Sequence, residues 1–294
     1  MKGCHRKFKV QSCAAFAYSR AVPKRQKFSV ALTIAGSDSG GGAGLQADLK
    51  TFAALGVHGT TAVTCVTVQN PLKVFAIQPC RPEIVRGQIE ALFAELPPRA
   101  VKTGLLHSAG IIRLVADFFD RAKCPPLIVD PVMVSTSGAR LLKTDAVRLY
   151  QESLLPLAAL VTPNLDEAEI LTGRSLRSVE DLKWAAREIR SRYGCAALVK
   201  GGHLKSLPAA VDVFWDGKTE LILSAPFVRG VATHGTGCTY SAAITAYLAR
   251  GLALPRAVSL AKLHITGCVS RSVRVGGHDV LGFGPRMGAV KSRN

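Results

Sequence analysis

The sequence predicts an α/β protein of three layers, in which helices cover both faces of a mostly parallel central sheet. Two observations carry this prediction. Short apolar segments rich in β-branched residues alternate with amphipathic segments of helical period. Glycine-rich loops follow several of the apolar segments, at the end of the strand where parallel sheets bind ligands. The chain has 294 residues, 48% of them hydrophobic, which is enough for one large domain.

The expected elements follow one another from residue 29 onward. Each expected strand is a short apolar run that ends at polar or turn-forming residues, and these runs are 29–34, 60–68, 100–103, 127–130, 159–162 and 196–200. Each expected helix carries apolar residues at intervals of three and four, and these segments are 45–55, 82–95, 109–121, 144–155, 179–192, a helix through 242–248, and 255–273. Asp216-Gly217, between the apolar runs 210–215 and 220–224, predicts a hairpin.

The two ends of the chain differ from its middle. Residues 1–27 contain eight Lys or Arg and no acidic residue, and residues 285–294 contain three and none. We expect a basic tail at 1–27, disordered or present only because the start lies too far upstream, with a transit peptide or a weak signal peptide as alternatives. We expect one domain over 28–275 and a basic C-terminal tail over 276–294.

The composition excludes several classes of protein. No apolar run approaches the roughly 18 residues that a membrane span needs, so we expect no membrane partner. Eight scattered cysteines without a Cys-x-x-Cys motif suit a reducing compartment, which we expect to be the cytoplasm, or an organelle if 1–27 is a transit peptide. The basic ends suggest nucleic acid, but aromatic residues make up only 6% of the chain, and we expect no such partner.

The stretch from Thr233 to Ser241 has the composition of an anion-binding loop. Gly235 and Gly237 alternate with small polar residues and lead directly into a helix. The start of a helix offers unpaired N–H groups and a partial positive charge, so this loop is suited to a phosphate. The same dipole should lower the pKa of Cys238 and make it a base or nucleophile. The alternatives are an ordinary turn and a small core cysteine.

A second glycine loop, Gly40 to Gly44, lies between the strand at 29–34 and the helix at 45–55. Residues 42–47 match the dinucleotide-binding pattern G-x-G-x-x-A, but the second strand ends in Gln69-Asn70 instead of the acid that binds a ribose. The two amides suit a neutral heterocycle, although Asn70-Pro71 is also typical of a simple turn.

Polar residues stand at the ends of the later strands. Asp130 ends one strand and suits a metal or phosphate, or the cap of a turn. Asn164 and Glu167 are three residues apart at a helix start, as in a capping box or a magnesium-ordering pair. Lys200 precedes paired glycines, where it could bind a nucleotide phosphate or remain solvated.

Seven segments taken together closely resemble the hydroxymethylpyrimidine/phosphomethylpyrimidine kinases of thiamine biosynthesis, in the ribokinase-like superfamily. They are AGSDSGGGAGLQAD (35–48), QN (69–70), KTG (102–104), DPVM (130–133), TPNLDEAE (162–169), KGGH (200–203) and THGTGCT (233–239). Each motif is weak alone, and their common order from about 29 to 273 is specific. The resemblance implies a ribokinase-like single domain that uses ATP and Mg²⁺ to phosphorylate 4-amino-5-hydroxymethyl-2-methylpyrimidine and then its monophosphate.

The resemblance also implies roles for individual residues. Gln69 would hold the pyrimidine, and Cys238 would stand where related sugar kinases place an aspartate base. The other expected contributors are Gly235, Thr236 and Gly237 in the anion hole, Gly36, Asp48, Asn70 and Leu106 at the substrate, Lys200, Asn164 and Thr233 at the nucleotide phosphates, and Glu167 and Asp130 at the metal. Members of this family often form dimers, so we expect a homodimer.

A pyridoxine or pyridoxal kinase is the nearest alternative, because it uses the same fold on another hydroxymethyl heterocycle. The amide pair Gln69-Asn70 favours the aminopyrimidine, whose edge offers a donor beside an acceptor. We also expect Gly40 to Gly44 to leave room for either a hydroxyl or a phosphate on the reacting arm.

Overall fold

The computed structural model describes residues 27–121, 123–133, 144–202, 204, 208–228 and 234–284. The strands are β1 (Val30–Ser37), β2 (His58–Gln69), β3 (Val74–Pro79), β4 (Ala100–Thr103), β5 (Leu127–Val129), β6 (Leu160–Val161), β7 (Ala196–Lys200), β8 (Ala209–Trp215), β9 (Glu220–Pro226), β10 (Val273–Val275) and β11 (His278–Val280). The helices are α1 (Gly44–Ala54), α2 (Pro82–Glu95), α3 (Ala109–Phe119), α4 (Thr144–Leu149), α5 (Leu165–Thr172), α6 (Val179–Tyr193), α7 (Thr236–Ala249) and α8 (Leu254–Ser270).

The strands β1 to β9 form one sheet in the order β3-β2-β1-β4-β5-β6-β7-β8-β9. The six central strands, from β2 to β7, are parallel, with β1 between β2 and β4 and Leu32 opposite both Thr60 and Val101. Antiparallel strands extend both edges, β3 on one side and the hairpin β8–β9 on the other. The carboxyl ends of the six parallel strands therefore lie along one edge of the sheet.

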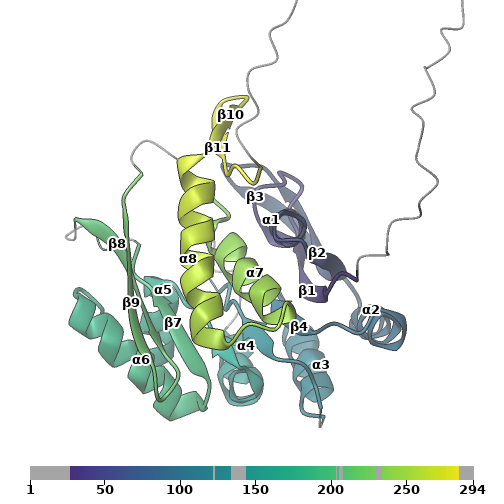
Figure 1. The fold of residues 1–294 in the computed structure, drawn as a ribbon. Coiled ribbons are helices and arrows are strands. Elements are labelled where there is room, and N and C mark those ends of the chain that lie inside the picture. The colour runs from purple at the N-terminus through teal and green to yellow at the C-terminus, as the bar shows by residue number, and fades with distance from the viewer. Residues whose placement is uncertain are drawn as a thin grey trace, which may run out of the picture.

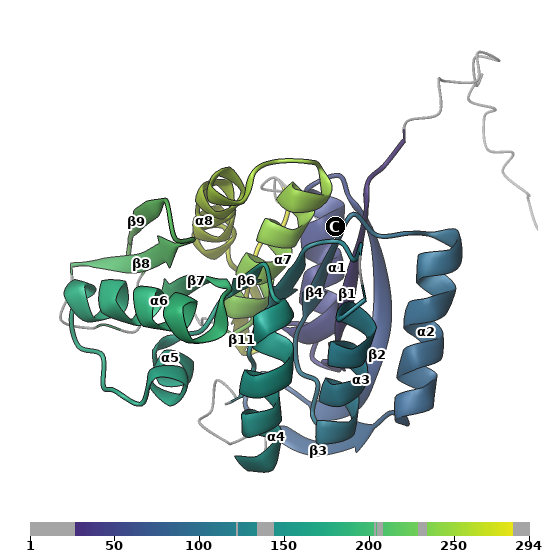
Figure 2. The ribbon, with the colours of Figure 1, turned by 90° about the horizontal axis from the view of Figure 1, so that it is seen from below.

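Helices cover both faces of this sheet (Figures 1 and 2). On one face α1, α7 and α8 pack against one another and against the sheet, and their apolar side chains form cores with Ile128, Leu198 and Phe214. On the other face α2 to α6 form a larger core with Leu32, Ile34 and Val129. The expected three-layer fold with a mostly parallel sheet is confirmed.

Three elements differ from the expectation. Strand β3 was not expected, because the run after Asn70-Pro71 is short and includes Gln78 and Pro79. The expected helix 144–155 is α4 followed by a π-helical turn (Tyr150–Leu154) and a 3₁₀ turn (Leu155–Leu157), where Pro156 offers no backbone N–H for a further α-helical bond. The expected tail 276–294 begins with β11, which pairs with β10.

An ion pair between β4 and α1 is fully buried below the carboxyl edge. The ammonium of Lys102 lies 2.9 Å from Asp48 Oδ2, and both side chains are 0% exposed. Thr33 Oγ1 also donates to Asp48, at 2.7 Å. Burial acts to lower the pKa of Lys102, but the charges of Asp48 and Asp130 and the hydrogen bond to Asp48 raise it overall. The pair thus joins the first helix to the sheet.

No helix among the described residues is long and apolar enough to cross a lipid bilayer.

The buried pair predicts the effect of Asp48→Ala. This change leaves the Lys102 ammonium without its partner, and removing one member of a buried pair lowers the free energy of unfolding by about 3–5 kcal/mol. Urea unfolding should show this loss, and the double variant Asp48→Leu/Lys102→Met should recover most of it. The control is Glu152→Ala, which removes the exposed pair Arg148–Glu152 and should not move the urea midpoint. Equal midpoints for Asp48→Ala and Glu152→Ala would show that the buried pair does not stabilise the fold.

Candidate active site

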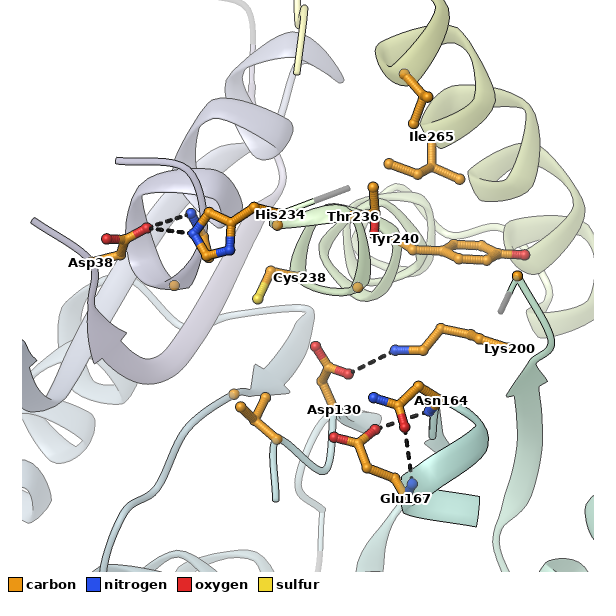
Figure 3. A pocket seen from close by; sticks show the side chains of 18 of the residues that line it. Asp38, Asp130, Asn164, Glu167, Lys200, His234, Thr236, Cys238, Tyr240 and Ile265 are labelled. Atoms are coloured by element: carbon orange, nitrogen blue, oxygen red, sulfur yellow. Dashed lines mark hydrogen bonds and ion pairs between the residues drawn. The ribbon is translucent and has the colours of Figure 1, made fainter. Parts of the chain in front are cut away.

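A cavity of about 590 Å³ runs along the carboxyl edge of the sheet. Its walls come from segments that are distant in the sequence: the end of β1 and the glycine loop, the end of β2, the loops after β5 and β6, the end of β7, the hairpin β8–β9, and the helices α7 and α8. The close-up in Figure 3 shows side chains from these segments facing one another. The cavity therefore lies where parallel α/β sheets bind ligands.

The predicted anion loop forms the start of α7 and lines the cavity. Gly235 is the N-cap residue and has φ +83°, a conformation that glycine adopts without strain. A side chain at Gly235 would also collide with the carbonyl oxygen of Gly42, so the two glycine loops touch through their backbones. Thr236, Gly237 and Cys238 follow in the first turn and line the same cavity. The structure thus gathers all four expected residues of this loop.

Cys238 faces the cavity, but its thiol is not acidic. Burial raises the pKa of Cys238 to about 12; the Lys102 ammonium acts to lower it, and Asp130 and Asp48 act to raise it further. The expectation that the helix dipole lowers this pKa is therefore wrong, because loss of hydration and two nearby carboxylates outweigh the helix start. Burial thus favours the protonated form of the Cys238 thiol.

Asp130 connects three elements at the cavity floor. Its carboxylate accepts from Thr162 Oγ1 at 3.2 Å, from Lys200 Nζ at 3.2 Å and from Ser241 Oγ at 3.1 Å. Burial acts to raise the pKa of Asp130, but Lys200 and Lys102 lower it overall, so the group is ionised. Lys200 reaches this point from the end of β7, and its ammonium lies beside Gly237 of the anion loop.

Asn164 and Glu167 form the capping box of α5 and also line the cavity. Asn164 Oδ1 accepts from the N–H of Glu167, and Glu167 Oε2 accepts from the N–H of Asn164, both at 2.9 Å. Glu167 is 3% exposed, and burial raises its pKa to about 7, against the opposing charge of Lys200. The capping box is therefore confirmed, and the Glu167 carboxylate that closes it also lies on the side of the cavity where Asp130 and Lys200 are found (Figure 3).

The two carboxylates suit magnesium rather than a metal held by protein groups alone. In the described part of the chain no group of three or more His, Cys, Asp or Glu side chains could hold a metal ion. Magnesium is commonly bound by one or two carboxylates with water and phosphate oxygens as its other ligands. Asp130 and Glu167 in a cavity with an anion loop fit this type of site.

The opposite end of the cavity is built by Gly36, Gln69, Asp38 and His234. A side chain at Gly36 would approach Cys65 Sγ to 2.7 Å, so glycine keeps this wall open. Gln69 lines the cavity, and the end of its side-chain amide lies 3.3 Å from Thr67 Oγ1. Gly36 and Gln69, which were both expected at the substrate, thus line the cavity.

Three of the expected substrate residues do not line the cavity. Asp48 is buried in its pair with Lys102. Leu106 is 1% exposed and belongs to the core, while its neighbour Leu105 lines the cavity. Asn70 Oδ1 accepts from the N–H groups of Leu72 and Lys73, so its amide closes a turn. The expectation that these three side chains face the substrate is therefore corrected. Thr233, which was expected at the nucleotide phosphates, lies outside the described residues.

Several residues of the cavity were not expected from the sequence. His234 directly precedes Gly235, the first glycine of the anion loop, and it contacts Asp38, which is 196 positions earlier in the chain. Asp212 of β8 and Lys262 of α8 form a buried pair of 2.7 Å on the cavity wall, beside Tyr240. His234 could have been suspected from its place beside Gly235, but the pairing of Asp212 with Lys262 leaves no signal in the sequence.

The comparisons with known proteins agree with this geometry. A family model described as phosphomethylpyrimidine kinase matches residues 38–282. A hydroxymethylpyrimidine/phosphomethylpyrimidine kinase from Rhizobium meliloti (strain 1021) is 48% identical over 252 residues, which cover 84% of this chain and 92% of that protein.

Two solved structures show the same fold. The phosphomethylpyrimidine kinase from Clostridium difficile 630 is 42% identical, with a TM-score of 0.73 over 82% of this chain and 98% of that one. The Bacillus subtilis pyridoxal kinase, in complex with ADP, is 37% identical, with a TM-score of 0.80 over 87% of this chain and 97% of that one. By the family model and by its relatives, this chain belongs to the phosphomethylpyrimidine kinase family.

Proposed function

We propose that this kinase transfers the γ-phosphoryl group of ATP to 4-amino-5-hydroxymethyl-2-methylpyrimidine and then to its monophosphate, giving the diphosphate used for thiamine. The observation that carries this proposal is the order of groups along one cavity. His234, which lies 3.5 Å from Gln69, is at one side of the cavity, Cys238 of the anion loop is in the middle, and Asp130, Glu167 and Lys200 are at the other side (Figure 3). A substrate heterocycle, the phosphoryl group being transferred and the phosphates of the nucleotide would have to lie in the same order along the cavity.

The protein's contribution to this reaction is mainly position and charge. Phosphoryl transfer passes through a loose transition state whose charge is spread over the phosphoryl oxygens. The N–H groups at the start of α7 and the ammonium of Lys200 face the space where that charge develops. Cys238, next to these N–H groups, is placed to take the proton of the substrate hydroxyl late in the transfer, through its minor thiolate form.

Asp130, Glu167 and Asn164 are the residues that would order magnesium. Mg²⁺, when bound with ATP, would neutralise phosphate charge as it develops. The protein side of this site is preformed, since backbone N–H groups already orient Glu167 and the side chains of Thr162 and Ser241 orient Asp130.

The alternative of a pyridoxal kinase has specific support from the Bacillus subtilis structure, which shares the fold. Gln69 favours the pyrimidine, because one amide offers an acceptor to the 4-amino group and a donor to the adjacent ring nitrogen. The pyridoxal ring carries a hydroxyl group at the corresponding edge. No nucleic-acid partner is proposed, since the described cavity accounts for the chemistry that the motifs indicate.

A side-by-side assay tests the proposed function. Purified protein with Mg-ATP is given the aminopyrimidine alcohol, its monophosphate, or pyridoxal, and ADP release and product are followed. We expect turnover of both pyrimidines with a kcat/KM at least about tenfold above that for pyridoxal, because a substrate that cannot make the matched pair of hydrogen bonds loses this much transition-state stabilisation or more. Turnover of pyridoxal alone would overturn the pyrimidine assignment and leave the kinase assignment in place.

A homodimer is also proposed, on the basis of the sheet edge at β2 and β3. Val66 and Val68 are 51% and 59% exposed on β2, and Leu72 and Phe75 beside them are 70% and 56% exposed. These exposed apolar residues lie on β2, on the loop after it and on β3, the strand at the edge of the sheet. Monomeric proteins usually cover or charge such an edge. A second copy of the chain related by a two-fold axis would cover the same residues on both partners.

Light scattering with size-exclusion chromatography tests the dimer. The wild type should have twice the mass of the chain, and Val68→Glu should shift the mass toward that of a monomer, because it places a charge in the apolar interface. Leu263→Glu is the control, since Leu263 is 68% exposed on α8 and away from β2 and β3. A wild type of monomer mass at micromolar concentration would end this proposal.

A further inference from the structure

His234 lies between the two halves of the cavity and contacts both. Its Nε2 atom is 3.3 Å from Asp38 Oδ2 and 3.5 Å from Gln69 Nε2, and the next residue is Gly235 of the anion loop. We propose that His234 is a positioning residue that orients the Gln69 amide toward the heterocycle and holds the anion loop in register with it. This inference rests on the proposed function, and it assigns His234 to specificity for the acceptor substrate.

Asp38 is a fixed hydrogen-bond acceptor. Its carboxylate takes the N–H of Gly40 at 2.8 Å, of Gly42 at 3.0 Å and of Ala43 at 2.7 Å, and it is 3% exposed. Burial acts to raise the pKa of Asp38, but the hydrogen bonds of His234, Ala43 and Gly40 lower it overall. Asp38 is thus ionised and cannot donate.

An ionised Asp38 decides where the imidazole carries its proton. A lone pair on His234 Nε2 would face the carboxylate and be repelled, so Nε2 carries a hydrogen and donates it to Asp38. This N–H also points near Gln69, whose nearest amide atom is the nitrogen, a second donor. The two donors no longer face each other when the amide is turned by about 180°. Its oxygen then shares the Nε2–H of His234 with Asp38, and its nitrogen donates to Thr67 Oγ1, whose own hydrogen goes to the carbonyl oxygen of Ser37 at 2.8 Å.

The orientation of this amide matters for recognition. Gln69 can offer its oxygen and nitrogen to an aminopyrimidine edge in one order or in the reverse order. His234 selects one order, and with it the direction in which the hydroxymethyl arm points along the cavity. Without His234, the Gln69 amide would have only Thr67 beside it and could adopt either orientation.

His234 is also linked to the anion loop by close packing against the backbone of the first glycine loop. A side chain at Gly42 would approach His234 Cδ2 to 2.8 Å, so glycine at this position makes room for the imidazole. Gly235 packs against the carbonyl oxygen of Gly42 in turn. Movement of His234 would therefore shift the loop that is placed to receive the phosphoryl group, and with it the alignment of heterocycle and phosphate.

Steady-state kinetics of His234→Ala, His234→Gln, Gln69→Ala and the double variant His234→Ala/Gln69→Ala test this inference. We expect His234→Ala to raise the KM for the aminopyrimidine alcohol about tenfold or more, with the KM for Mg-ATP unchanged, because one hydrogen bond that orients the substrate's partner is lost. His234→Gln should recover most of this loss, since a glutamine N–H can donate to Asp38. The KM of the double variant for the alcohol should be no higher than that of Gln69→Ala alone, because His234 acts on this KM through Gln69.

The control variant is His278→Ala. His278 of β11 lines a small hollow beside the cavity together with His234 and Asp38, and its removal should leave both KM values unchanged. Thermal unfolding of each variant separates loss of fold from loss of orientation.

The role of His234 would be overturned by either of two results. One is a KM for the alcohol in the double variant that rises by the product of the two single-variant increases; the other is no recovery of KM in a folded His234→Gln variant. If the wild type does not turn over the pyrimidine, the proposed function fails, and the same four variants are then measured with the alcohol that it does phosphorylate. Non-additive KM effects there would still support the coupling, and multiplied effects would still overturn it.

Discussion

The site depends on charges that are buried beside one another at the carboxyl edge of the sheet. Lys102 is held by Asp48, and Lys200 by Asp130, so that each ammonium has a carboxylate within 3.2 Å. A buried charge without such a partner destabilises a fold strongly. Strands β4, β5 and β7 and helices α1 and α7 are therefore placed relative to one another by the need to compensate these charges, and the anion loop is placed with them.

The same charges determine what Cys238 can do. Burial and the carboxylates of Asp130 and Asp48 keep its thiol protonated, although it lies at the start of a helix beside Lys102. A strongly acidic thiol would place a permanent negative charge where the phosphoryl oxygens must approach. A thiol of high pKa avoids this repulsion and accepts a proton only in its minor thiolate form, which suits a reaction that needs position and charge stabilisation more than a strong base.

Much of the fold could be predicted, because periodicity and turn residues are local properties of the chain. The six parallel strands and the helices between them lie close to their expected positions, whereas β3 was missed because its short run has neither a clear period nor a strong boundary. The glycine loops and Asp130, Asn164, Glu167 and Lys200 could be placed at the site because parallel strands end at one edge. Asp48 and Leu106 were misplaced because a motif does not show which face of an element points to a cavity. The contact of His234 with Asp38 depends on tertiary packing alone.

The pH dependence of pyrimidine phosphorylation in the wild type and in Cys238→Ala tests the central claim most directly. The deprotonated thiol is the active form and its pKa is raised, so wild-type turnover should increase with pH, about tenfold per unit, between about pH 6 and pH 9. Cys238→Ala should have a kcat about 10²–10⁴-fold lower and a nearly unchanged KM for the pyrimidine. Its kcat should not rise with pH above the pKa of Glu167, which is about 7. A variant with wild-type kcat and the same pH dependence but a raised KM would contradict the account and make Cys238 a binding residue.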